Sequence, residues 1–340
     1  MNPIKKPNKV NPEELIKEIY KKILLRDPDQ LGLDYYISQM KNGKLTQSDI
    51  EKQLYDSEEA QSIRNFSHYS DKYWNDLKRV GQYKNKLSTD NENSTWIADI
   101  PNRFGDFLPF ENVLIVGCGN GWLERELSDK NIGKKFDSFD ISEEYIKEAE
   151  SQKEDRLINY FIDDINNLEK IKPNSYDAVF NFAILHHATE LDNAMKKLSD
   201  SLKPNGLIFN EEYIGPARNQ YTDKHLNIML GVMADLPEKF HSKYSLKQPL
   251  ANFRVEPSEA IHSDLVIPIF KKYFDIVYER NMNGGIAYQI LWNNIENFKD
   301  SADPESAKWL DYLLEQDFSH SKEKHVPILF WYGVGTTKKK

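Results

Sequence analysis

The chain of 340 residues carries 45 basic and 54 acidic residues, which gives a net charge of −9. At about 150 residues per domain, this length predicts roughly two domains. The mean hydropathy of −0.70 and the short apolar runs exclude a spanning helix, which needs about 18 consecutive apolar residues. The first residues contain no apolar signal segment, so we expect a cytoplasmic protein.

The composition also limits the classes of site and partner. The single cysteine, Cys118, excludes an internal disulfide and a zinc site built from several cysteines. Acidic residues are spread over both halves of the chain, so charge offers no reason to expect binding along a nucleic-acid backbone. Aromatic residues make up 12% of the chain, which argues against disorder over its whole length.

Residues 1–66 are predicted to form a helical domain. Apolar residues recur every three or four positions in three stretches, which lie before Arg26, before Gly43 and around Ile50. Three or more short helices within residues 11–64 would bury a core near the lower limit of independent stability.

Residues 67–104 are predicted to connect this domain to the rest of the chain. A helical stretch lies around Trp74 and Leu77. Residues 84–95, KNKLSTDNENST, are polar and lack periodicity, so we expect a linker or mobile loop there. Trp96 then opens an amphipathic segment.

From residue 105 to the C-terminus the pattern predicts one α/β domain. Strands and helices alternate, as is typical of a parallel sheet covered on both faces. Two insertions, at about residues 213–261 and 285–322, interrupt the alternation, and the second is predicted to be helical. The predicted strands are residues 112–116, 136–140, 158–162, 176–182, 206–211, 274–279 and 327–334, and the predicted helices are residues 122–130, 143–149, 191–202 and 262–272.

A glycine-rich turn follows the first predicted strand. The sequence VLIVGCGNGW places Gly117, Gly119 and Gly121 between a buried strand and a helix, where backbone amides can meet a ligand. The dinucleotide fingerprint would need a third glycine at position 122, which is Trp, and this counts against NAD or FAD. Asp140 ends the second strand, where a carboxylate can accept two hydrogen bonds from the hydroxyls of a ribose.

These residues carry a resemblance to class I S-adenosylmethionine-dependent methyltransferases. The segments VLIVGCGNGWLEREL, FDSFDIS, DDINNL, SYDAVFNFAILHH and LKPNGLIFNEE follow the family's order. The resemblance implies a Rossmann-like seven-stranded sheet with helices on both faces and S-adenosyl-L-methionine as the cofactor. Within the cofactor-binding set that it implies, the three glycines face the methionine part, Asp140 holds the ribose, Asp164 and Ile165 meet the adenine, Asn181 and Phe182 flank the methionine end, and Ile141 is a further member.

The catalytic candidates are His187 and Glu212, which follow the fourth strand and end the fifth. Methyl transfer is an in-line displacement that depends on positioning, and a base is needed only if the acceptor must lose a proton. We expect the neighbouring Asp163 to be solvated and Cys118 to be no catalytic thiol. The first insertion suits a lid, and further candidates near the acceptor are Arg218, Tyr221, His225, Glu259 and His262, with Ser258 as a helix cap. No sequence spacing is typical of a metal site, so we predict a metal-independent enzyme.

The N-terminal helices resemble a domain of unknown function related to phycobilisome linkers, which often accompanies glycan-modifying enzymes. Tyr36 stands where this pattern usually has Trp. The resemblance implies a docking or oligomerisation module. The residues that match the pattern are Arg26, Asp27, Pro28, Asp29, Gly32, Leu33, Tyr36, Ser57 and Glu58.

Together these features predict methyl transfer to a hydroxyl of a small molecule or glycan precursor. The glycan link depends only on the association of the N-terminal module. Two alternatives stay open: N- or C-methylation of a metabolite or lipid-like acceptor, and a cofactor-binding scaffold that has lost turnover.

Overall fold

The computed structural model describes residues 11–24, 26–57, 59–60, 74–242, 246, 258–292, 294–298 and 303–338. The chain divides into two compact units. One comprises Met1–Asp71 with Gln248–Pro257, and the other comprises Lys72–Lys247 with Ser258–Lys340. Among the helices described, none is both long and apolar enough to cross a membrane.

The first unit contains α1 (Pro12–Leu24), α2 (Gln30–Lys41) and α3 (Gln47–Tyr55), as the periodicity predicts. Asp29 caps α2 by accepting a hydrogen bond from the amide of Gly32. A Cβ atom on Gly32 would lie 2.6 Å from the Tyr20 hydroxyl, so glycine lets α1 and α2 approach closely. The apolar core of this unit consists of Ile16, Ile19, Tyr20, Leu24, Leu33, Ile50, Leu54 and Ala60.

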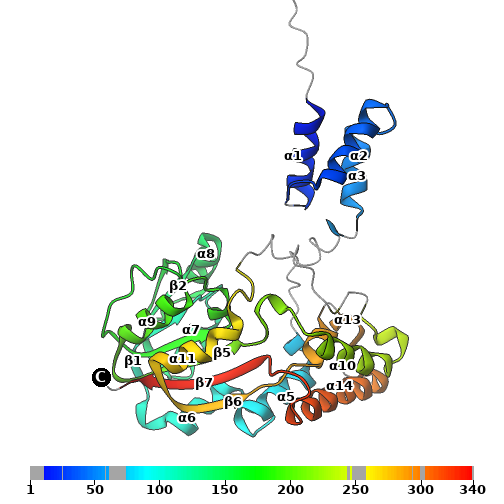
Figure 1. The fold of residues 1–340 in the computed structure, drawn as a ribbon. Coiled ribbons are helices and arrows are strands. Elements are labelled where there is room, and N and C mark those ends of the chain that lie inside the picture. The colour runs from blue at the N-terminus through cyan, green and yellow to red at the C-terminus, as the bar shows by residue number, and fades with distance from the viewer. Residues whose placement is uncertain are drawn as a thin grey trace, which may run out of the picture. The chain divides into compact units, whose positions relative to one another are not determined.

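The second unit is built on a seven-stranded sheet with the order β3-β2-β1-β4-β5-β7-β6 (Figure 1). The first five strands run parallel, whereas β7 runs antiparallel to both β5 and β6. The strands are β1 (Phe110–Val116), β2 (Gly133–Asp140), β3 (Ile158–Ile162), β4 (Tyr176–Phe182), β5 (Leu202–Tyr213), β6 (Phe274–Asn281) and β7 (Phe330–Thr337).

The sequence pattern predicted all seven strands but not the direction of β7. The chain leaves β6, passes through the second insertion and returns without a crossover helix, so β7 pairs antiparallel with its predecessor. The sheet is therefore mixed, and Figure 1 shows the red β7 running between β5 and the orange β6.

Each face of the sheet carries its own apolar core, because side chains alternate along a strand. On β1, Val113 and Ile115 join one cluster, and Leu114 and Val116 join the other. The first cluster includes side chains of α6 (Trp96–Phe104), α7 (Trp122–Asp129) and α8 (Glu143–Gln152), and the second includes α9 (Leu191–Ser201) and α11 (Val266–Tyr273).

The two insertions contribute to a third apolar core beside the sheet. Val80 of α5 (Lys78–Thr89) packs in this cluster, and Asp317 binds the segment after β6 by accepting hydrogen bonds from the amides of Gly284, Ile286 and Ala287. The inserted helices are α10 (Asp223–Ala234), α12 (Ala287–Leu291), α13 (Ile295–Phe298) and α14 (Pro304–Lys322). Short 3-10 helices cover Trp74–Asp76, Gly105–Phe107, Leu185–His187, Ala217–Asn219, Glu238–Phe240 and Ser263–Leu265.

The predicted connector, residues 67–104, differs from the structure where it is described. Residues 84–89 are the end of α5, not part of a loop, and Ser88 and Thr89 are buried. Trp96 of α6 stacks on Phe180 in the central strand, with 6.4 Å between ring centroids. This part of the chain therefore belongs to the α/β unit, because its apolar face covers the sheet. Residues 67–73 lie outside the described residues.

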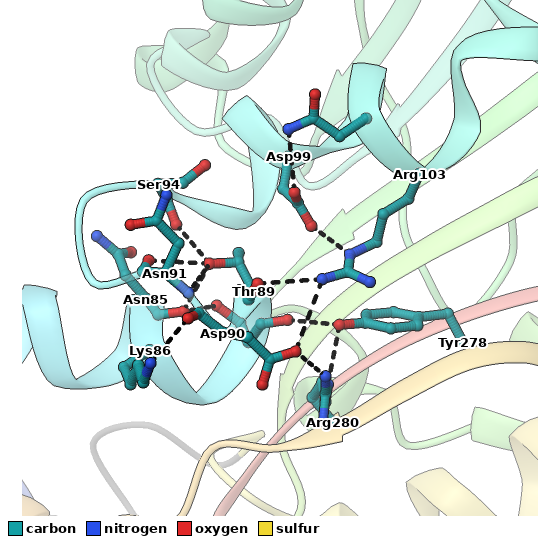
Figure 2. Close-up of polar contacts among 12 residues, drawn as sticks. Asn85, Lys86, Thr89, Asp90, Asn91, Ser94, Asp99, Arg103, Tyr278 and Arg280 are labelled. Carbon is teal, nitrogen blue, oxygen red and sulfur yellow. Dashed lines mark hydrogen bonds and ion pairs between the residues drawn. The ribbon is translucent and has the colours of Figure 1, made fainter.

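A polar network holds the turn between α5 and α6 (Figure 2). Asp90 ends α5 in the left-handed region, with φ of 66°, and forms an ion pair with Arg280 of β6. Tyr278 of β6 donates a hydrogen bond to the carbonyl of Ser88 over 2.8 Å, and Arg103 lies 4.5 Å from the centre of the Tyr278 ring. Only residues 90–95 of the predicted loop lie outside helices, and this turn is bonded to β6.

Replacing Trp96 with Ala tests whether α6 is part of the core. Deleting a buried aromatic side chain usually lowers the free energy of unfolding by about 3–5 kcal/mol, and we expect a loss of this size. Phe107→Ala is the control, because that ring is 47% exposed and its loss should change stability by less than about 0.5 kcal/mol. Denaturant unfolding measures both, and equal effects would refute the packing role of α6.

Glu124 is an exception in the apolar core. This α7 residue is fully buried, and neither carboxyl oxygen has a hydrogen-bond partner among the described residues. Burial raises the pKa of Glu124 to about 7, because desolvation disfavours the charged carboxylate. The folded protein therefore holds a proton here at pH values where the unfolded chain has released it.

This proton makes stability depend on pH. Because the folded pKa is raised, the contribution of Glu124 is fully present below about pH 4.5 and is lost as the pH rises to about 7. Glu124→Gln cannot ionise, so its stability relative to wild type should grow by up to about 3 kcal/mol across that range. Urea unfolding at pH 4.5, 6 and 8 measures the difference, and parallel pH curves for the two proteins would contradict it.

Candidate functional site

The carboxyl ends of the parallel strands meet at one edge of the sheet. Val116 pairs in register with Phe139 of β2 and Asn181 of β4, and Asp140 pairs with Ile162 of β3. The strand order reverses at β1 and β4, which is where open α/β sheets bind ligands. The turns after β1 to β5 therefore form the candidate site.

The glycine turn after β1 adopts a backbone that favours glycine. Gly117, Gly119 and Gly121 have φ values of 63°, 52° and 80°. A Cβ atom on Gly117 would lie 2.4 Å from Ile184, and one on Gly121 would lie 2.4 Å from the Tyr160 hydroxyl. At Gly119 it would meet nothing within 4 Å, so this glycine borders open space at the sheet edge.

Asp140 fastens the glycine turn to the end of β2. Its Oδ2 atom accepts a hydrogen bond from the amide of Gly119 over 2.9 Å, and Oδ1 accepts one from the amide of Ser142 over 2.9 Å. A carboxylate oxygen can accept more than one bond, so this buried side chain can also receive ligand hydroxyls. Ile141, the next residue, is 70% exposed at the same edge.

The paired aspartates after β3 have different environments. Asp163 was expected to be solvated, but it is buried and accepts hydrogen bonds from the amides of Asp164, Glu169 and Lys170. This prediction was wrong because the loop folds back over the first aspartate. Asp164 is half-buried and accepts from the amide and side chain of Asn166. Ile165 beside it is also half-buried.

Asn181 and Phe182 end β4 close to the glycine turn. Asn181 is fully buried and donates a hydrogen bond to Glu212 over 2.9 Å, while its own oxygen has no partner among the described residues. Phe182 is half-buried and contacts Trp122 edge to face, with ring centroids 5.2 Å apart. Trp122, which excludes the dinucleotide fingerprint, therefore packs over the end of β4.

Glu212 is buried, and its carboxylate connects several parts of the site through hydrogen bonds. The residue is 1% exposed, and its two oxygens accept hydrogen bonds from Asn181 and from the amides of Ile184, Leu185 and Tyr213. Its Oε1 atom also pairs with Nδ1 of His186. Burial would raise the pKa of Glu212, but the charge and hydrogen bonds of His186, with those of Asn181 and Leu185, outweigh it and hold the pKa below its usual value.

Two histidines and a distant glutamate come together beside this carboxylate. The rings of His186 and His187 are tilted against each other with centroids 4.2 Å apart. Oε2 of Glu259 lies 3.8 Å from Nε2 of His186 and 3.7 Å from Nε2 of His187. Nδ1 of His187 is 3.2 Å from the hydroxyl of Ser258. His186 and Glu259 are buried, and His187 is half-buried.

The other predicted acceptor contacts have mixed outcomes. Arg218 is half-buried and donates a hydrogen bond to the carbonyl of Glu259 over 3.0 Å. Tyr221 and His225 are buried in the third core, where His225 bonds the carbonyl of Gly285, so both are core residues. His262 is half-buried, ahead of α11.

The structure also bears on the predictions for Ser258 and Cys118. Ser258 does not cap α11, which begins only at Val266. Burial raises the pKa of the Cys118 thiol, which disfavours the nucleophilic thiolate.

Sequence reasoning missed the pairing of the histidines with Glu259. Ser258 and His187 are 71 residues apart, and no local spacing links them. The sequence showed only that His186 and His187 follow the fourth predicted strand and that Ser258 and Glu259 precede a predicted helix. The sequence analysis also assigned no role to Glu211. This residue points away from Glu212 and forms a buried ion pair with Lys84 over 2.6 Å.

Family models match two parts of the chain. One, described as a methyltransferase domain, matches residues 114–210, and the other, a domain of unknown function (DUF4214), matches residues 5–63. The first spans the turn, strands and histidines described above, from β1 into β5.

Individual relatives match the same region. Ubiquinone biosynthesis O-methyltransferase of Xanthomonas campestris pv. campestris is 29% identical over 104 residues, or 30% of this chain and 43% of the relative. Phosphoethanolamine N-methyltransferase 2 of Caenorhabditis elegans is 27% identical over 128 residues, or 37% of this chain and 29% of the relative. The matches therefore span less than half the length of these relatives.

A solved structure with a similar fold is phosphoethanolamine N-methyltransferase 2 of Haemonchus contortus in complex with S-adenosyl-L-methionine. The match covers 82% of this chain and 60% of that chain, with 15% identity and a TM-score of 0.45. From the domain matches, the chain contains a methyltransferase domain, with a DUF4214 domain ahead of it.

Proposed function

We propose that the protein transfers a methyl group from S-adenosyl-L-methionine to a hydroxyl of a small molecule or glycan precursor. The observation that carries this proposal is the sheet edge that brings the glycine turn and Asp140 to the same end of the strands as the cluster of His186, His187 and Glu259. A cofactor site and a group of proton-accepting side chains thus adjoin the end of β4.

The cofactor would lie along the carboxyl ends of β1 to β4. Gly119 leaves open space for the methionine part, Asp140 is available to the ribose hydroxyls, and Asp164 with Ile165 borders the adenine position. Asn181 and Phe182 then flank the sulfonium end. Asp140 matters most in this arrangement, because it holds the turn and faces the ligand at once.

A hydroxyl acceptor needs a group that removes its proton, and His187 is our candidate for that role. Its ring is half-buried and adjoins the carboxylate of Glu259. A general base of this kind usually contributes 10²- to 10⁴-fold in rate. Glu212, the other catalytic candidate, is enclosed by five donors and acts instead as a positioning residue for His186 and the turn after β4.

The rate of methyl transfer depends mainly on the alignment of the acceptor oxygen with the methyl group of the cofactor. A lone pair of the acceptor oxygen forms the new O–C bond while the C–S bond breaks, and sulfur keeps the electron pair. The products are a methyl ether and S-adenosylhomocysteine, and the acceptor proton leaves through the histidine cluster. Holding the oxygen in line with the methyl group supplies much of the rate.

N-methylation is the second candidate, because the relatives include a phosphoethanolamine N-methyltransferase as well as an O-methyltransferase. An amine acceptor that binds as the free base would not need His187. The glycan-precursor part depends on the association of the DUF4214 domain, which we propose as a docking or oligomerisation module.

Cofactor binding is tested with Asp140→Ala in the full chain. Removing the carboxylate loses the ribose contacts and frees the glycine turn, so we expect the affinity for S-adenosyl-L-methionine to fall at least about 100-fold, the equivalent of two bonds to a charged group. Asp155→Asn, at an exposed position, is the control and should bind like wild type. Calorimetry measures both, and undetectable binding by wild type would refute the proposed function.

The acceptor class is tested by incubating cell extract with the protein and methyl-labelled cofactor, followed by mass spectrometry of the labelled product. We expect a labelled small molecule or glycan precursor with a new methyl ether. With that acceptor, His187→Gln should lower kcat at least about 100-fold while cofactor affinity stays within about twofold.

Other labelling outcomes decide against parts of this proposal. A labelled amine, with kcat insensitive to His187→Gln, would favour N-methylation. A labelled protein or nucleic acid would refute the small-molecule proposal. Cofactor binding without any labelled product would favour a scaffold that has lost turnover.

A further inference from the structure

The histidine cluster has the geometry of a metal site. His186, His187 and Glu259 each offer one ligand atom, and these three atoms lie within 4.8 Å of one another. The carboxylate oxygen is 3.8 Å and 3.7 Å from the two nitrogens, too far for direct hydrogen bonds. Three donor atoms therefore surround a point that is close to each of them.

Outer partners orient both rings toward this point. Glu212 binds Nδ1 of His186, and the Ser258 hydroxyl lies 3.2 Å from Nδ1 of His187. A histidine that donates from Nδ1 presents the lone pair of Nε2, and metal-bound histidines nearly always have such a partner on the other nitrogen. The same arrangement on two adjacent rings is what a metal site requires.

Charge and backbone support the same conclusion. Glu212 and Glu259 are 1% and 5% exposed, so two carboxylates lie buried next to the rings. The negative charges of both carboxylates would favour a divalent cation bound beside them. Arg218 donates a hydrogen bond to the carbonyl of Glu259 and so helps to fix the backbone that carries this ligand.

We propose that His186, His187 and Glu259 bind one divalent transition-metal ion, of which Zn²⁺ is the representative, through Nε2, Nε2 and Oε2. Two imidazoles and one carboxylate suit such ions rather than Mg²⁺ or Ca²⁺, which prefer oxygen ligands. In a tetrahedral zinc site adjacent ligand atoms are about 3.3 Å apart, so the two pairs that include Oε2 need to contract by a few tenths of an ångström. Three protein ligands leave a coordination position for another molecule.

The role of this ion deepens the proposed function and rests on it. The site adjoins the end of β4, where the methyl group of the cofactor is expected. An acceptor hydroxyl bound to the ion has a lowered pKa and releases its proton to water. The resulting alkoxide attacks the methyl carbon, the C–S bond breaks and sulfur keeps the electron pair. Under this proposal His187 acts as a ligand and not as the base, the proton leaves to water and not through the histidines, and the enzyme would depend on metal, unlike the sequence-based expectation.

Metal binding is tested with chelator-treated full-length protein. Titration with Zn²⁺ in a calorimeter and with Co²⁺ in a visible spectrometer should both give one ion per chain, and Co²⁺ should produce absorption bands of a low-coordinate site. Glu259→Gln and His187→Gln should each weaken Zn²⁺ binding at least about 100-fold, since even loss of an outer partner costs 10- to 100-fold. Ser258→Ala, which removes such a partner, should weaken it about 10-fold.

The control removes a second pair of histidines that could bind metal adventitiously. His320 and His325 lie near the end of α14 with their Nδ1 atoms 3.3 Å apart, so His320→Gln with His325→Gln should leave the Zn²⁺ affinity unchanged. Thermal unfolding without metal checks that each variant folds. If Glu259→Gln does not fold, Ser258→Ala and Glu259→Asp decide, and each must weaken binding.

The proposal fails if wild type binds no stoichiometric metal, or if the cluster variants bind like wild type while the α14 variant does not. It also fails if chelator-treated and Zn²⁺-loaded protein transfer methyl groups at the same rate. Metal titration needs no cofactor, so a protein that binds one Zn²⁺ but no S-adenosyl-L-methionine would refute the proposed function and retain the metal site.

Discussion

The buried carboxylate of Glu212 connects the elements that form the candidate site. It receives hydrogen bonds from Asn181 at the end of β4, from the amides of Ile184 and Leu185 in the following turn, and from its neighbour Tyr213. An ionised group without water requires such partners, because desolvation is otherwise too costly. The turn after β4 and the orientation of His186 therefore follow from one side chain on β5.

Side chains alternate along β5, so the adjacent Glu211 and Glu212 point to opposite faces and have different partners. Glu212 points to one face and orders the histidines, whereas Glu211 points to the other and pairs with Lys84 of α5. Lys84 also lies 6.0 Å and 5.6 Å from the ring centres of Trp74 and Phe330. The segment before the sheet is thus coupled to the end of β5, and α5 with the inserted helices encloses an apolar core of its own.

In the N-terminal unit, the residues that match the DUF4214 pattern have structural roles. Asp29 caps α2, Gly32 allows contact with Tyr20, and Arg26 forms a two-bond ion pair with Glu59 at 2.7 Å and 2.9 Å. Ser57 accepts a hydrogen bond from the amide of Ala60. The pattern therefore encodes caps and close packing, and Glu58, the last residue that matches it, lies outside the described residues.

The sequence by itself determined the local elements and placed the glycine turn and Asp140 at the carboxyl ends of the strands. Strand alternation, helix periodicity and the glycine turn are encoded within about 20 residues, so all seven strands, Asp140 and the turn could be predicted. Residues 84–89 were wrongly predicted as part of a loop, because their polar side chains hide the fact that this end of α5 is partly buried. Only tertiary structure decided that β7 runs antiparallel and that the side chains of Asp163 and Glu212 are enclosed by hydrogen-bond donors. It also brought Glu259 to the histidines, because burial and convergence of side chains 71 or more residues apart depend on how the sheet and insertion pack, which no local pattern records.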